Sequence, residues 1–159
     1  MAKKESKTNA MRILERMKIP FTHQEYECDE FTDGSSTADR LGLPHEQVFK
    51  TLVTVGADRQ NYVFVIPVGD SLDLKKAARA VKEKSIEMVA VKEINALTGY
   101  VRGGCSPVGM KKQYPTVFHE TAEIVDTIMV SAGKIGYQVE LAPDALIELV
   151  GASTADVTV

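Results

Sequence analysis

The chain has 159 residues, of which 44% are hydrophobic and 26% charged, which excludes a disordered chain and is typical of one globular domain. Its net charge of −3 excludes a general electrostatic attraction to nucleic acid, so RNA binding has to use a local basic patch. The longest apolar run, residues 62–68, is too short to cross a membrane, and with no secretory leader recognised we expect a cytoplasmic location.

The first part of the chain contains one clear helix followed by strand patterns. Ala10, Ile13, Leu14 and Met17 recur at helical spacing, with Ser6 or Thr8 as a cap and Pro20 as the end. The patterns then predict a strand over residues 22–27, a turn at 33–34, a short helix over 35–41, and strands over 48–55 and 62–67. The last of these is almost entirely apolar, which predicts a strand covered on both faces.

The rest of the chain alternates between helices and strands. A helix over residues 73–84, capped by Asp73, should bury Leu74, Ala77, Ala78 and Val81. After it we expect a strand over 87–91, a helix over 92–97, strands over 116–119, 126–131 and 137–141, and a helix over 143–150. We therefore predict one compact α/β domain over residues 1–159, with a mixed β-sheet and surrounding helices.

Several familiar catalytic patterns are absent from the sequence. Dinucleotide and P-loop glycine motifs are missing, and so is the serine elbow of the α/β-hydrolases. The three histidines are widely spaced, and Cys28 and Cys105 have no metal-binding spacing. We expect no metal, no cofactor and no conventional side-chain nucleophile.

Lys50 interrupts an apolar strand. Strand alternation places it on the face of Val48 and Leu52, and places Thr51 on the opposite, more core-like face. The lysine either points into a cleft or extends from the edge of the sheet into solvent, and the residues alone favour the second interpretation.

The loop over residues 103–109 contains three glycines and a proline. Gly103 and Gly104 allow close approach to the backbone, whose amide groups can stabilise a carbonyl oxygen that gains negative charge, although an ordinary tight connection has the same composition. Cys105 lies within the loop, but no histidine is within ten residues, so a small buried side chain is favoured over a nucleophile.

Two further segments are candidates for ligand binding. The helix over 73–84 has a basic outer face that could bind RNA phosphates, although a solvated face is the default; this face carries Lys75, Lys76, Arg79 and Lys82. The segment Ser131 to Gly136 fits either a pocket lining or a simple turn.

Four motifs in this order resemble one known family. They are F-K-T-L at 49–52, L-D-L-K-K-A-A at 72–78, T-G-Y-V-R-G-G-C-S-P-V-G at 98–109 and V-S-A-G-K-I-G at 130–136. Together they resemble the YbaK/EbsC-type Cys-tRNA(Pro) deacylases, in the superfamily of the editing domain of bacterial prolyl-tRNA synthetase. The resemblance extends along nearly the whole chain.

The resemblance implies a compact α/β fold with a mixed, partly barrel-like sheet. It also implies an enzyme that removes cysteine mistakenly joined to tRNA(Pro), with the mischarged tRNA and prolyl-tRNA synthetase as partners and no DNA or membrane partner. In the family the thiol of the substrate attacks its own ester carbonyl and forms a cyclic thiolactone, so neither a protein nucleophile nor a metal is required. The protein contributes positioning and charge stabilisation.

The site residues implied by the resemblance follow its motifs. Lys50, Gly103 and Gly104 match the catalytic lysine and the glycine loop. The implied substrate-binding residues are Tyr26, Phe31, Thr51, Ser106, Pro107, Ser131 and Gly133. Gln138 lies where some relatives carry an acidic residue, so no carboxylate role is assigned there.

Two alternatives to Cys-tRNA(Pro) deacylation remain open. A pocket that differs by one methylene discriminates only roughly 10–200-fold, so the substrate could instead be Ala-tRNA(Pro) or a broader set of mischarged tRNAs. The domain could also bind the tRNA or the synthetase without catalysis.

Overall fold

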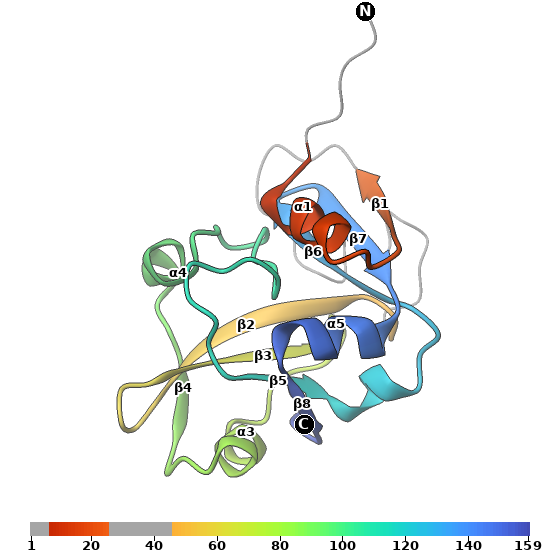
Figure 1. Ribbon diagram of the computed structural model, residues 1–159. Helices are drawn as coiled ribbons and strands as arrows, with labels where there is room; N and C mark the ends of the chain where they lie inside the picture. The colour runs from red at the N-terminus through yellow and green to blue at the C-terminus, as the bar shows by residue number, and fades with distance from the viewer. Residues whose placement is uncertain (1–6, 26–45) are drawn as a thin grey trace, which may run out of the picture.

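The computed structural model describes residues 7–25 and 46–159, drawn in colour in Figure 1. The turn at 33–34 and the helix over 35–41 that we expect from the sequence lie outside these residues. No helix among the described residues is both long and apolar enough to span a membrane.

The larger sheet is mixed and has the strand order β4-β2-β3-β5-β8. Its strands are β2 (Phe49–Gly56), β3 (Asn61–Pro67), β4 (Ile86–Met88), β5 (Thr116–His119) and β8 (Ser153–Ala155). The β2–β3 and β2–β4 pairs are antiparallel, whereas the β3–β5 and β5–β8 pairs are parallel. The predicted mixed α/β architecture is confirmed.

A smaller antiparallel sheet has the order β1-β7-β6. Its strands are β1 (Phe21–Glu25), β6 (Ile128–Lys134) and β7 (Tyr137–Leu141). A single parallel bridge between Val48 and Met129 joins the two sheets where β2 begins and β6 has just begun. The amide of Met129 strengthens this junction by donating to the carbonyl of Gln47 at 3.0 Å. Because the bridge fixes β2 beside β6, it also sets the geometry of the candidate site.

Helices cover both faces of the larger sheet. The main core lies between this sheet, the smaller sheet, α1 (Asn9–Arg16) and α5 (Pro143–Val150). A second core forms on the other face, where α3 (Leu74–Val81) packs through Ala77 and Ala78. Figure 1 shows α1 and α3 on opposite sides of the sheet, with α4 (Val91–Thr98) at one end. A short 3₁₀ helix follows β5.

The central strand β3 explains why the sheet needs cover on both faces. Val63 and Val65 enter the main core, while Phe64 and Ile66 enter the second core, and all four side chains are fully buried. This alternation confirms the prediction that the apolar run is covered on both sides.

Two predicted helix faces differ from the structure at their ends. Met17 is 56% exposed because it is the C-terminal cap of α1, and Met11, which the periodicity did not select, is buried instead. Leu74 is 42% exposed because it is the first residue of α3, where Asp73 caps the helix as predicted. The strand expected over 87–91 ends at Met88, since Val91 already begins α4.

Candidate functional site

Lys50 lies on β2, two residues after the bridge to β6. The antiparallel register pairs it with Ile66, so its side chain is on the face of the sheet that Val48 and Leu52 share. The half-buried ammonium group donates to the carbonyl of Val68 at 3.4 Å. The side chain therefore lies across the sheet surface close to β3 and is neither fully buried nor fully exposed.

Ser131 and Gln138 form the polar centre of the smaller sheet. They are direct cross-strand partners on β6 and β7, so their side chains lie on the same face. Ser131 is 9% exposed and Gln138 is 6% exposed, and no hydrogen bond from the Gln138 side chain to another described residue is present. The two side chains therefore place a hydroxyl and an amide next to each other on this face of the smaller sheet.

The bridge between the sheets brings Lys50 to this polar face. Val48 and Met129 face the same side, and Lys50 and Ser131 each follow their bridge residue by two positions. The register therefore places Lys50, Ser131 and Gln138 on one continuous side of the joined sheets. Thr51 faces the opposite side, toward Val65, and its buried hydroxyl has no partner among the described residues.

The glycine loop lies directly against the β6–β7 hairpin that carries Ser131. A Cβ atom on Gly104 would be 2.9 Å from the amide nitrogen of Ile135 and 3.1 Å from the carbonyl carbon of Lys134. Only glycine allows this approach of two backbones. Gly103 (φ +86°) adopts a left-handed conformation, which an L side chain would strain. These contacts place the loop against the end of the hairpin whose β6 strand carries Ser131.

The loop contains amide groups that are not used by the fold. The amide of Gly104 donates to the carbonyl of Val101 at 2.9 Å, and that of Val108 donates to Ser106 Oγ at 3.2 Å. Within the described chain, the amides of Gly103, Cys105 and Ser106 make no such hydrogen bond. A tight turn already uses the N–H group of Gly104, so the amides of Gly103, Cys105 and Ser106 are the remaining donors of the loop.

Cys105 and Pro107 contribute shape to the loop. Both are buried, and burial raises the pKa of the Cys105 thiol to about 12, against a smaller lowering by a hydrogen bond with Thr98. A thiol with this pKa is almost entirely protonated at neutral pH and is a poor nucleophile. The structure therefore supports the interpretation of Cys105 as a small buried side chain.

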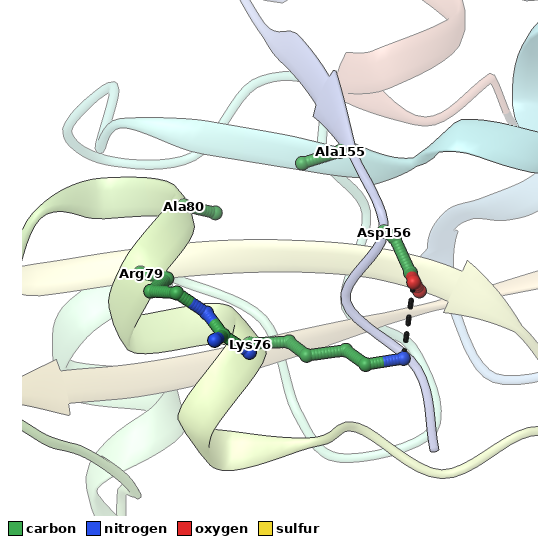
Figure 2. Close-up of a pocket in the computed structure, with 5 residues that line it drawn as sticks. All are labelled: Lys76, Arg79, Ala80, Ala155 and Asp156. Carbon is green, nitrogen blue, oxygen red and sulfur yellow. Dashed lines mark hydrogen bonds and ion pairs between the residues drawn. The ribbon is translucent and has the colours of Figure 1, made fainter.

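The basic face of α3 divides into two groups. Lys75, Arg79 and Lys82 are exposed, whereas Lys76 forms an ion pair with Asp156 at 3.0 Å and donates to the carbonyl of Thr158 at 2.9 Å. Figure 2 shows the Lys76 side chain extended from the helix to Asp156 across a shallow pocket of about 340 Å³. This ammonium anchors the C-terminal segment, whereas Lys75, Arg79 and Lys82 remain exposed, and the phosphate contacts of this face stay a prediction.

A cluster of potential metal ligands lies at the end of β5. One donor atom from each of His119, Glu120 and Asp156 lies within 4.8 Å of the others. The Nδ1 atom of His119, however, accepts a hydrogen bond from the Val157 amide at 3.2 Å, and Nε2 is 3.3 Å from the hydroxyl of Thr158. Both ring nitrogens thus hold the C-terminal segment, and the cluster is explained by the fold.

Sequence reasoning assigned no role to Gln138 and did not examine Tyr100. Tyr26 and Phe31, predicted to bind substrate, lie outside the described residues. The sequence does contain a signal for Gln138, because this polar residue lies between Tyr137 and Val139, which pack into the main core. Strand alternation therefore predicts that Gln138 is on the opposite face of the strand.

Comparison with known proteins gives consistent results. Residues 31–149 match the model of the aminoacyl-tRNA editing domain family. The chain is 48% identical, over 99% of its length and 98% of the relative, to an Enterococcus faecalis protein named "Putative Cys-tRNA(Pro)/Cys-tRNA(Cys) deacylase EbsC".

Solved structures show the same fold. One, described as a "putative trans-editing enzyme for prolyl tRNA synthetase", is 26% identical, with a TM-score of 0.79 over 94% of this chain and 96% of that chain. Another, a hypothetical protein 21% identical to this chain, has a TM-score of 0.83 over 93% of this chain and 97% of that chain.

Proposed function

This chain belongs to the aminoacyl-tRNA editing domain family, and we propose that it is a deacylase that removes cysteine from mischarged tRNA(Pro). The name of the E. faecalis relative, which includes Cys-tRNA(Pro) and Cys-tRNA(Cys) as substrates, supports this choice at 48% identity. The structure described as a trans-editing enzyme for prolyl-tRNA synthetase supports the link to that synthetase as a partner. A role in translation is consistent with a cytoplasmic location.

One observation carries the proposal most directly. The joined sheets carry Lys50, Ser131 and Gln138 on one side, and the glycine loop, whose amides of Gly103, Cys105 and Ser106 make no hydrogen bond within the described chain, packs against the β6–β7 hairpin. Ser131 and Gln138 offer a hydroxyl and an amide, which can orient a substrate by hydrogen bonds but do not act as strong nucleophiles. Such a site fits a reaction in which the nucleophile belongs to the substrate.

We propose the following chemical step. The cysteine thiol of the substrate loses its proton, and its sulfur attacks the ester carbonyl carbon within the same aminoacyl group. The carbonyl oxygen gains negative charge, the bond to the ribose oxygen then breaks, and that oxygen takes a proton. The products are free tRNA and a four-membered thiolactone, which water opens to give cysteine.

Each part of the site has a role in this step. The spare amides of Gly103, Cys105 and Ser106 could donate to the oxygen that becomes negative, and donors of this type contribute roughly 2.7–4 kcal/mol in other enzymes. The ammonium of Lys50 adds positive charge beside the same carbonyl or the thiolate. Ser131 and Gly133 on one side and Pro107 on the other limit the space available to the amino acid. Thr51, placed on the opposite face of β2, has no role in this proposal.

The test is deacylation by the purified protein of tRNA(Pro) charged with cysteine, serine or alanine, with Cys-tRNA(Cys) in parallel. Cysteine release should exceed the buffer rate, and Ser-tRNA(Pro) should react far more slowly because a hydroxyl is a much weaker nucleophile than a thiolate. Lys50→Ala should reduce the rate by about tenfold or more, whereas Lys50→Arg keeps the charge and should retain more activity. Equal rates for cysteine and serine would exclude the thiolactone route, and tight tRNA binding without turnover would favour a non-catalytic binding domain.

A further inference from the structure

Tyr100 lies between α4 and the glycine loop, and both its backbone amide and its backbone carbonyl form hydrogen bonds with side chains of α4. Its amide donates to Thr98 Oγ1 at 3.0 Å, and its carbonyl accepts from Asn95 Nδ2 at 3.3 Å. Both partners belong to α4, which ends at the left-handed residue Gly99. The backbone of Tyr100 is thus fixed to a helix before the loop begins.

The Tyr100 side chain joins the loop to the β6 strand. Its hydroxyl donates to the carbonyl of Val108 at 2.5 Å. A Cβ atom on Gly133 would be 2.8 Å from the ring atom Cε1, and one on Gly109 would be 3.0 Å from the hydroxyl. Gly133 and Gly109 both have positive φ, at +100° and +79°. The ring therefore fills the space that side chains at these two positions would occupy.

The loop also packs through Val108 into the main core, which contains Val130 and Ala132 of β6, but this apolar contact has no fixed direction. The hydrogen bonds from Gly104 to Val101 and from Val108 to Ser106 hold the loop only to itself. Gly104 lies close to the backbone of Lys134 and Ile135, and its own amide donates to Val101 rather than to the hairpin. Tyr100 adds a short, directed hydrogen bond at the far end of the loop. Burial raises the pKa of Tyr100 to about 12, so the hydroxyl keeps its proton and its donor role through the physiological range.

We propose that Tyr100 is a positioning residue that sets the distance between the glycine loop and the Ser131–Gly133 segment, and so aligns the loop amides with the substrate carbonyl. The proposal rests on the deacylase function proposed above. Tyr100 need not touch the substrate, because it acts through Val108 and Gly133. Misplacement of reacting groups by about 1 Å can reduce rates by ~10²-fold, so a smaller shift of the loop should be measurable in kcat.

The test compares Tyr100→Phe with the matched control Tyr114→Phe. Tyr114 is buried and also donates its hydroxyl to a backbone carbonyl, but its acceptor is Leu97 on α4 at 2.7 Å and not a residue of the glycine loop. Both variants lose one hydroxyl and one hydrogen bond of the same kind. We expect Tyr100→Phe to lower kcat by about tenfold with a nearly unchanged KM, and Tyr114→Phe to lose a similar amount of thermal stability with kcat retained.

Two outcomes would overturn the proposal. If both variants keep the wild-type kcat, or both lose it in proportion to their loss of stability, Tyr100 has only a structural role. Amide hydrogen exchange over residues 103–108 gives a second readout that does not depend on activity, and it should increase in Tyr100→Phe but not in Tyr114→Phe. If the wild-type protein deacylates no tRNA, the proposed function fails, while unchanged exchange in Tyr100→Phe would by itself refute the anchoring role of Tyr100.

Discussion

The contact between Gly104 and the β6–β7 hairpin gives the sharpest test of the site geometry. In Gly104→Ala the new Cβ has to move from 2.9 Å to the 3.4 Å at which ordinary contact with the Ile135 nitrogen begins, a shift of about 0.5 Å. The opposing atoms are backbone, so the loop moves as a unit and does not relax by a rotamer change. Gly104 does not require a positive φ, so the effect is steric. We expect a loss of roughly 1–3 kcal/mol in unfolding free energy and a decrease in kcat of about tenfold.

The matched control for this variant is Gly56→Ala. A Cβ atom there would be 2.6 Å from the Glu83 carboxyl group, which is the end of a flexible side chain at the far end of β2. This change should disturb the hydrogen bond from Tyr62 to Glu83 and lower stability without changing kcat. Both variants are compared by chemical denaturation and by single-turnover release of cysteine from Cys-tRNA(Pro). A Gly104→Ala protein that is destabilised yet retains the wild-type kcat would refute the link between loop position and catalysis.

Three further predictions follow from charges and pKa values. Burial raises the folded-state pKa of the Cys105 thiol to about 12 from an ordinary 9.0, so the thiol stabilises the fold fully below pH 9 and loses this contribution as the pH rises toward 12. By pH 10 the unfolding free energy of the wild type should therefore fall by about 1.4 kcal/mol more than that of Cys105→Ala, as measured by chemical denaturation. In a plot of log kcat/KM against log salt concentration, replacing Lys75 or Arg79 with alanine should make the slope shallower by roughly 0.7–0.9 for each lost phosphate contact. An unchanged slope would exclude phosphate contacts at that residue. The described polar face offers the amide of Gln138, and Glu140 is held by Thr127 and Gln47, so neither supplies a base for the substrate thiol. We therefore expect kcat to rise with pH as this thiol ionises, up to a pKa at or below the ordinary value of about 8.5 because the Lys50 ammonium favours the thiolate. A kcat that falls as the pH rises from 6 would contradict this prediction.

Elements marked by local signals were predicted well from the sequence. Helix α5 begins at Pro143 and ends before Gly151 in a left-handed cap, because both signals act through the backbone of the residue itself. Thr8 caps α1 and Asp73 caps α3 for the same reason. The strand Thr116–His119 was predicted at its observed bounds, since four successive buried residues leave little choice of conformation.

Features that depend on distant contacts could not be read in this way. Strand β8 is three residues long and has no exposed-to-buried alternation, so only its pairing with β5 defines it. The ion pair of Lys76 with Asp156 joins residues 80 positions apart, and the helical pattern alone therefore assigned this lysine to a solvated face. The cross-strand pairing of Ser131 with Gln138 is set by the hairpin register, which the glycines at 133 and 136 complicate by a bulge.

In the proposed mechanism the substrate supplies the nucleophile, and the glycines around Tyr100 then have a specific role in selectivity. Where the substrate supplies its own nucleophile, the protein can affect the rate through the position of the carbonyl, the placement of charge and the exclusion of poor geometries. Each of these depends on backbone atoms held within a fraction of an ångström, and backbone approaches of this kind are available only at glycine. Gly104 against the hairpin and Gly133 against the Tyr100 ring are both such approaches, at 2.9 Å and 2.8 Å for an added Cβ. If the proposed reaction is correct, substitutions that change this backbone spacing should affect chemical specificity more than removal of any nearby reactive side chain.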